Sequence, residues 1–123
     1  MFSHSLYLNL HLFGIFLTIA SLMGLATATV MGRELLPKGL RIALAAGHGI
    51  GVFLILLGGF GLLARLGIHG DWPLWIKLKL GLWGLFALLI VVVKRLPVAA
   101  KASWILLPAL AALAAWVAIY KPV

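Results

Sequence analysis

The sequence predicts an all-α membrane protein, built as an up-down bundle of four transmembrane helices. Hydrophobic residues make up 65% of the 123 residues, charged residues make up only 10%, and the apolar residues fall into four long blocks. A water-soluble domain has roughly a quarter of its residues charged. We therefore expect a chain that is dissolved in lipid and forms a single membrane domain over residues 1–123.

The helices are expected over residues 5–32, 38–66, 73–95 and 101–120. Each contains an apolar run of about 19–25 residues, and a rise of about 1.5 Å per residue carries such a run across about 30 Å of hydrocarbon. The connections have about ten residues or fewer, so neighbouring helices must be antiparallel. Pro108 lies inside the last segment and is expected to kink it.

Charge and cysteine content exclude several kinds of chemistry. The chain has ten Lys and Arg residues but only two acids, Glu34 and Asp71, and it has no cysteine. Paired carboxylates for acid–base catalysis, acidic metal clusters and thiol chemistry are therefore ruled out, and we expect neither catalytic residues nor a metal site. The basic residues punctuate apolar spans rather than forming a solvated patch, which favours lipid headgroups over nucleic acid as the partner.

The distribution of basic residues predicts the orientation. The connections after the first and third helices, with their flanks, carry six of them, whereas the opposite side carries four. The positive-inside rule then places both termini outside the cytoplasm, most simply of a bacterial inner membrane. The aromatic residues expected near the outer interface are Tyr7, Trp72, Trp75, Trp116 and Tyr120.

Small and polar residues form stripes along three of the expected helices, and such stripes are typical of helix packing in lipid. The first helix carries His11, Gly14, Thr18, Ser21, Leu25, Ala28 and Gly32 on one face, and the second carries Gly47, Gly51, Leu54, Gly58, Gly61 and Arg65. The third carries Lys77, Gly81 and Gly84 on one face, and Trp72, Trp75, Lys79, Trp83 and Phe86 on another.

Ionisable side chains inside the spans are the candidates for chemistry, because burying them in a membrane is costly. His11, Lys77 and Lys79 are expected at one depth, in the outer half of the bundle. His48 lies about 20 Å deeper by helix rise, which opposes a haem ligated by both histidines. Each histidine can simply bond to a facing hydroxyl or backbone carbonyl, and the lysines can snorkel to headgroups. Because Lys77 and Lys79 differ by about 200° around a helix, at least one should point into the bundle or along a groove between helices.

Two short motifs, His11-x8-Ala20-Ser21-Leu22 and Trp75-x3-Lys79-Leu80, resemble those of the HemJ and SirB-type families of small membrane proteins. CopD-domain proteins have a similar four-helix layout. The resemblance implies a role with haem b or a porphyrin, with protoporphyrinogen oxidation as the activity of the HemJ family. It selects His11 and Lys79 as cofactor-binding residues. Apart from the resemblance, a haem on His11 would have Lys79 or Arg65 near its propionates, and Lys77 is a further candidate for binding the cofactor.

Three functions remain open at this point. The first is a non-catalytic accessory, assembly or structural subunit of a membrane complex, without any cofactor, in contact with lipid and with other membrane subunits or further copies of itself. The second is a haem- or porphyrin-binding redox protein centred on His11 and Lys79. The third is a small oligomeric transporter or channel.

Overall fold

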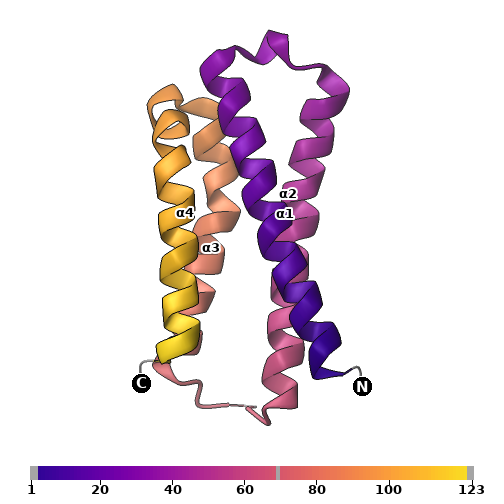
Figure 1. Cartoon of the computed structure of the whole chain (residues 1–123), viewed down its shortest axis with the longest axis vertical. Helices are drawn as coiled ribbons and strands as arrows, with labels where there is room; N and C mark the ends of the chain where they lie inside the picture. Colours follow the sequence, from indigo (N-terminus) through magenta and orange to yellow (C-terminus); the bar gives the residue numbers. More distant parts are fainter. Residues whose placement is uncertain (1–2, 69, 122–123) are drawn as a thin grey trace.

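The computed structural model describes residues 3–68 and 70–121, and this part of the chain forms four α-helices and a short 3-10 turn (Figure 1). In chain order they are α1 (His4–Met31), the turn η1 (Arg33–Leu35), α2 (Lys38–Arg65), α3 (Leu74–Arg95) and α4 (Pro97–Tyr120). Each of these helices is long and apolar enough to cross a membrane. The predicted all-α, four-helix membrane fold is therefore confirmed.

Local sequence sets the helix ends. The Ser3 hydroxyl caps α1 by accepting the Leu6 N–H at 3.1 Å, which satisfies one of the unpaired donors of the first turn. Beyond α2, Gly67 has a φ of 75°, which glycine adopts without strain. The Gly67 N–H donates to the Ala64 carbonyl and the Ile68 N–H to the Leu63 carbonyl, both at 3.1 Å, so α2 ends in a Schellman motif.

The last helix begins earlier than predicted. The sequence predicted a start at residue 101, but α4 begins at Pro97 and only Leu96 separates it from α3. A proline has no N–H and a fixed φ, so it suits the first turn of a helix. Pro108 lies inside α4, and the helix continues through it.

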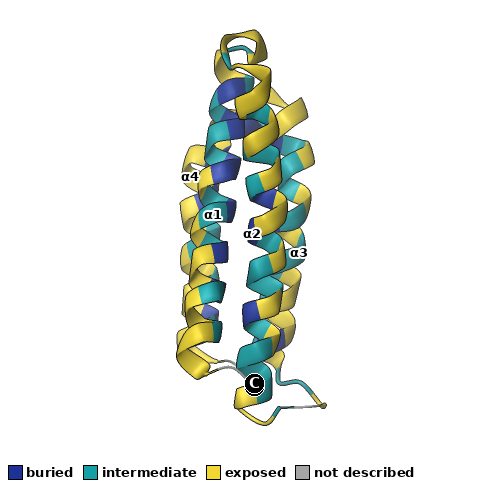
Figure 2. Ribbon diagram, turned by 90° about the vertical axis from the view of Figure 1, so that its right-hand side faces the viewer, coloured by how far each residue is buried: buried dark blue, intermediate teal, exposed yellow. Residues whose placement is uncertain are grey.

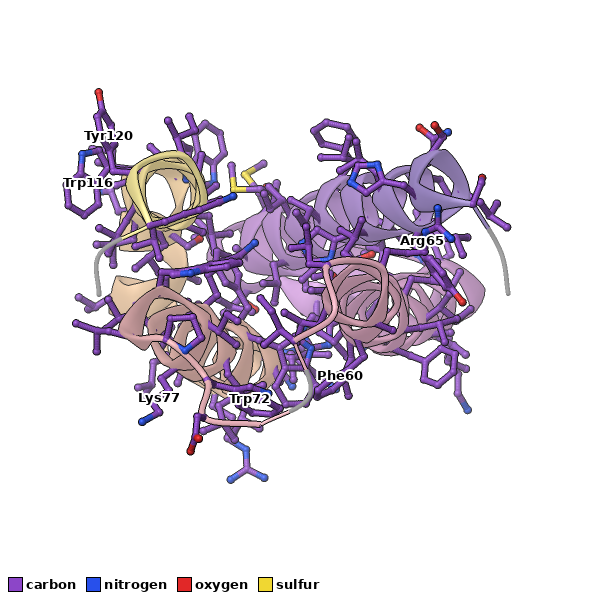
Figure 3. The ribbon with its side chains drawn as sticks, turned by 90° about the horizontal axis from the view of Figure 1, so that it is seen from below. Phe60, Arg65, Trp72, Lys77, Trp116 and Tyr120 are labelled. Carbon is purple, nitrogen blue, oxygen red and sulfur yellow. The ribbon has the colours of Figure 1, made fainter. Side chains whose placement is uncertain are left out.

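The two ends of the bundle differ in character. The α1–α2 and α3–α4 connections lie at one end, and both termini and the α2–α3 connection lie at the other (Figure 1). We call the first the cationic end; its basic residues are Arg33, Lys38, Arg41, Lys94, Arg95 and Lys101. We call the second the aromatic end. There Phe60 and Trp72 pair with ring centroids 5.9 Å apart, and Trp116 pairs with Tyr120 at 5.3 Å (Figure 3).

The apolar core lies where α1, α3 and α4 meet, and dark blue positions on α1 mark it in Figure 2. Its members are Leu22, Leu25, Ala26, Phe86, Val93, Ala100 and Leu107. Large apolar side chains elsewhere point outward, including Phe16, Leu88 and Ile105. Such a surface is unfavourable in water and suits hydrocarbon.

Candidate functional site

The helices α1 and α2 approach each other closely along a line of glycines. A Cβ atom at Gly58 would lie 2.6 Å from the His11 backbone nitrogen, and one at Gly14 would lie 2.7 Å from the Ile55 nitrogen. Only hydrogen fits at such positions. We call this contact the α1–α2 seam; its residues are Tyr7, His11, Gly14, Thr18, Ser21, Gly47, Gly51, Gly58 and Gly61. The stripes predicted on these two helices therefore do face each other.

Two hydroxyl groups of α1 lie against glycines of α2. Thr18 is fully buried, and within the described residues its Oγ1 has no hydrogen-bond partner. It lies where a side chain at Gly51 would begin, and the Ser21 Oγ lies in the same way over Gly47, at 2.6 Å from an added Cβ. The hydrogen that each glycine carries in place of Cβ thus points at an oxygen. This repeated geometry is that of weak Cα–H···O contacts between membrane helices.

His11 lies in the seam with only 9% of its surface exposed. Its Nδ1 is 2.8 Å from the backbone carbonyl oxygen of Ile55 on α2. A carbonyl can only accept, so Nδ1 carries the proton and donates it, which leaves Nε2 with a lone pair in the neutral ring. His11 therefore ties α1 to α2 and keeps one nitrogen able to accept a hydrogen bond or a metal.

The charge of Lys79 acts on this site. The side chain is half-buried on α3, close enough for its charge to act on both His11 and Lys121. Lys121 itself lies over the ring of Trp75, with Nζ 5.3 Å from the ring centroid. His11 and Lys79 therefore lie within electrostatic range of each other.

Lys77 points away from the bundle, as Figure 3 shows. Lys79 is half-buried, as expected if one of the two lysines points into the bundle or along a groove between helices. The packing predicted for the face of Lys77, Gly81 and Gly84 is wrong, because an added Cβ at either glycine would meet no described atom within 4 Å. The bulky face of α3 packs inward instead, since it buries more apolar surface.

Arg65 does not join this group. Figure 3 places it beside α1 and α2, away from Lys77 on the outer side of α3. It also follows Gly58, the glycine level with His11, by seven residues, which is about 10 Å of helix rise toward the aromatic end. Arg65 and Lys77 therefore lie apart from each other, and a role for either beside a haem propionate stays a prediction.

His48 belongs to a separate, purely internal contact between α2 and α3. Its Nε2 donates to the carbonyl of Phe86 at 3.0 Å, while Trp83 on α3 donates its indole N–H to the carbonyl of Val52 at 2.8 Å. His48 thus bonds to a backbone carbonyl, one of the two partners expected from the sequence. The part played by Trp83 was missed, although an indole N–H inside an apolar span signals the need for an acceptor.

The two histidines lie at different depths. His11 is level with Gly58, ten residues beyond His48 on α2, so the offset is about 15 Å rather than the predicted 20 Å. Over residues 3–68 and 70–121, no three His, Asp or Glu side chains gather closely enough to hold a metal ion.

No protein-family model, curated protein or solved structure matches this chain. The class of protein therefore rests on the geometry, which defines an α-helical membrane bundle with a glycine-lined seam.

Proposed function

We propose that this protein is a non-catalytic subunit of a membrane complex, which packs against a transmembrane helix of another chain through α3. The observation that carries the proposal is the outward face of Lys77, Gly81, Gly84 and Leu88, of which Gly84 alone is half-buried and the other three are exposed. These positions recur every three or four residues and so lie on one side of the helix. The buried histidines and Trp83 are already used to hold the bundle together.

Small residues on an outward face have a physical use in lipid. A glycine lets a neighbouring backbone approach closely, and van der Waals packing rather than the hydrophobic effect drives helices together in a membrane. Leu88, with 68% of its surface exposed, lies one turn beyond Gly84 and offers an apolar knob to the same neighbour. The neighbour can be a different subunit or another copy of this chain.

Placing a leucine at Gly81 should abolish this association. A benzophenone attached to a single cysteine at Leu88 should give one discrete cross-linked product in native membranes, since the chain has no cysteine of its own. The same label at Ile105 on α4, which is 77% exposed, should give none. Gly81→Leu should lower the yield at Leu88 about tenfold, whereas Gly49→Leu, at another open glycine, should not.

The proposal fails if the label at Leu88 gives no product of discrete mass, or if Gly81→Leu and Gly49→Leu leave equal yields. The mass of the cross-linked species separates a second copy from a different subunit.

A second candidate function, haem or porphyrin binding, has one specific observation in its favour. The bond to Ile55 orients the His11 ring and leaves Nε2 as the lone-pair nitrogen, as hydrogen bonds to protein carbonyls do for ligating imidazoles. Lys79 lies within electrostatic reach and could pair with a propionate. This would give the HemJ-like site that the sequence motifs suggest. A bound haem would supply one-electron redox chemistry.

Absorption spectra test this candidate. Purified protein from cells supplied with haem should show a Soret band that disappears in His11→Ala and persists in His48→Ala, because the motifs select His11, whereas His48 lies about 15 Å away from that level and bonds between α2 and α3. A folded, colourless wild type would eliminate it. So would equal loss of the band in both variants.

We also propose that the chain resides in a bacterial inner membrane with its cationic end in the cytoplasm and both termini outside. The support is the count of six basic residues at the cationic end against Arg65, Lys77, Lys79 and Lys121 toward the other. Labelling of single cysteines from outside the cell tests this orientation.

A further inference from the structure

An open cleft of about 280 Å³ lies at the cationic end. Basic side chains from η1, α2 and α3 converge on it, and apolar side chains of α1 and α2 complete its wall. Its lining residues are Leu25, Ala28, Thr29, Arg33, Lys38, Arg41, Ile42 and Lys94. A second open cleft of about 280 Å³ shares Arg33 and Lys94 with the first and adds Ile90, Val91 and Arg95. Basic and apolar side chains therefore line both clefts.

These cations lack a counter-charge. Glu34 is the one acid in the sequence near this end, since Asp71 follows α2 at the opposite end. The Glu34 carboxylate folds back over Gly32, with its Oε1 2.7 Å from the position of an added Cβ. Among the described residues, Glu34 forms no ion pair with any of the basic residues. Like charges gathered in this way repel one another unless an anion lies between them.

Arg41 adds a more specific signal. Its Nε is buried and has no hydrogen-bond partner within the part of the chain that the structure describes. A buried N–H donor without an acceptor is costly, and native proteins rarely keep one unless a ligand, an ion or water satisfies it. Arginine is also the side chain best suited to bind two oxygens of a phosphate at once.

The depth of the cleft and its apolar wall indicate which groups a bound phosphate would carry. It lies where α1 ends, α2 begins and α3 ends, which is the level of the lipid headgroups for helices that span the membrane. Its volume of about 280 Å³ has room for several waters, which is more than a lone phosphate occupies. Ile42 and Leu25 in the wall provide a surface for glycerol and the first acyl carbons.

We propose that this cleft is a binding site for the phosphate group of an anionic glycerophospholipid. Arg41 donates to the phosphate from inside the cleft, while Arg33 and Lys94 hold it from the rim that the two clefts share. The acyl chains leave along the apolar wall toward the hydrocarbon. Basic pockets between membrane helices recognise anionic headgroups by this combination of charge and depth. The proposal depends on neither the α3 interface nor a haem.

Lipid retention in detergent tests the proposal. The full chain is delipidated in a neutral detergent and titrated with fluorescent phosphatidylglycerol, with phosphatidylcholine as the zwitterionic comparison. We expect saturable binding of phosphatidylglycerol that weakens at least about tenfold in Arg41→Gln, since each charged hydrogen bond contributes on this scale. The matched control is Lys101→Gln, which removes one charge at the same end but outside both clefts.

Two additions keep the test decisive. Lys94→Gln changes an exposed side chain and should weaken binding similarly even if Arg41→Gln fails to fold. Inorganic phosphate and soluble glycerol phosphate distinguish the sources of the phosphate, and both should compete only weakly. Equal binding of both lipids, equal weakening by Lys101→Gln, or displacement of the lipid by inorganic phosphate at comparable affinity would overturn the proposal.

Discussion

The variant Gly58→Ala is expected to be less stable than the wild type by about 2 kcal/mol or more, the range seen when an interior is overpacked. The added methyl group would lie 2.6 Å from the His11 backbone nitrogen and 2.7 Å from both the His11 Cβ and the Tyr7 carbonyl oxygen. Two of these three are backbone atoms, which no change of rotamer can move. The helices α1 and α2 must therefore separate along the seam.

Separation costs more than one contact. The hydrogen bond from His11 to the Ile55 carbonyl spans the same two helices, and it lengthens as they move apart. The contacts of Thr18 and Ser21 with glycines of α2 weaken in the same way. We expect Gly14→Ala to behave like Gly58→Ala, because its methyl group would meet backbone atoms of Gly51 and Ile55.

The measurement is unfolding in mixed detergent micelles, followed by tryptophan fluorescence. Gly49→Ala is the matched control: it lies on the same helix, an added methyl group meets nothing within 4 Å, and alanine has the higher helix propensity. It should be as stable as the wild type or slightly more stable. Equal stability of Gly58→Ala and Gly49→Ala would show that the seam is not tightly packed.

A reagent added outside the cell is expected to label a cysteine at the aromatic end of the bundle and not one at the cationic end. Gly70→Cys lies in the α2–α3 connection at the aromatic end, and Glu34→Cys lies in η1 at the cationic end; both positions are exposed. A membrane-impermeant maleimide should label Gly70→Cys in intact cells and Glu34→Cys only after permeabilisation. Each Lys or Arg near an anionic cytoplasmic leaflet contributes about 1 kcal/mol, so the end with two more of them favours that side.

The chain has no native cysteine, so each variant reports a single position. Gly70→Cys is preferable to a cysteine at Asp71, whose φ of 44° disfavours most side chains. Labelling of both variants after permeabilisation provides the control for reactivity. If Glu34→Cys were labelled in intact cells, the orientation would be the opposite of the proposed one, with both termini in the cytoplasm.

Sequence reasoning predicted the helices and the small-residue stripes of α1 and α2 because both depend on local patterns. In lipid, a long apolar run satisfies its backbone hydrogen bonds by forming a helix. Small residues that recur at helical spacing must lie along one face of that helix. The pairing of Gly58 with His11 came from the structure, since the sequence placed His11 about 20 Å rather than about 15 Å from the level of His48.

The faces of α3 could not be assigned in this way. Its sequence offers a glycine face and an aromatic face, and each has a plausible role in packing. The structure buries the face of Trp83 and Phe86, where two side-chain donors reach carbonyls across α2 and α3, and leaves Gly81 exposed. The choice depends on which acceptors the neighbouring helix presents, and such acceptors are backbone atoms that no sequence pattern reveals.

Composition and spacing alone thus determined a lipid-embedded bundle without carboxylate or thiol chemistry. A chain with few charges and no cysteine lacks these groups whatever fold it adopts. Tertiary structure decided the rest. It left Lys79 half-buried within electrostatic range of His11, turned Lys77 outward, set Arg65 apart from Lys77, and gathered Arg33, Arg41 and Lys94 around one cleft. These residues come from segments far apart in the chain, and only helix packing sets their distances and the direction in which each side chain points.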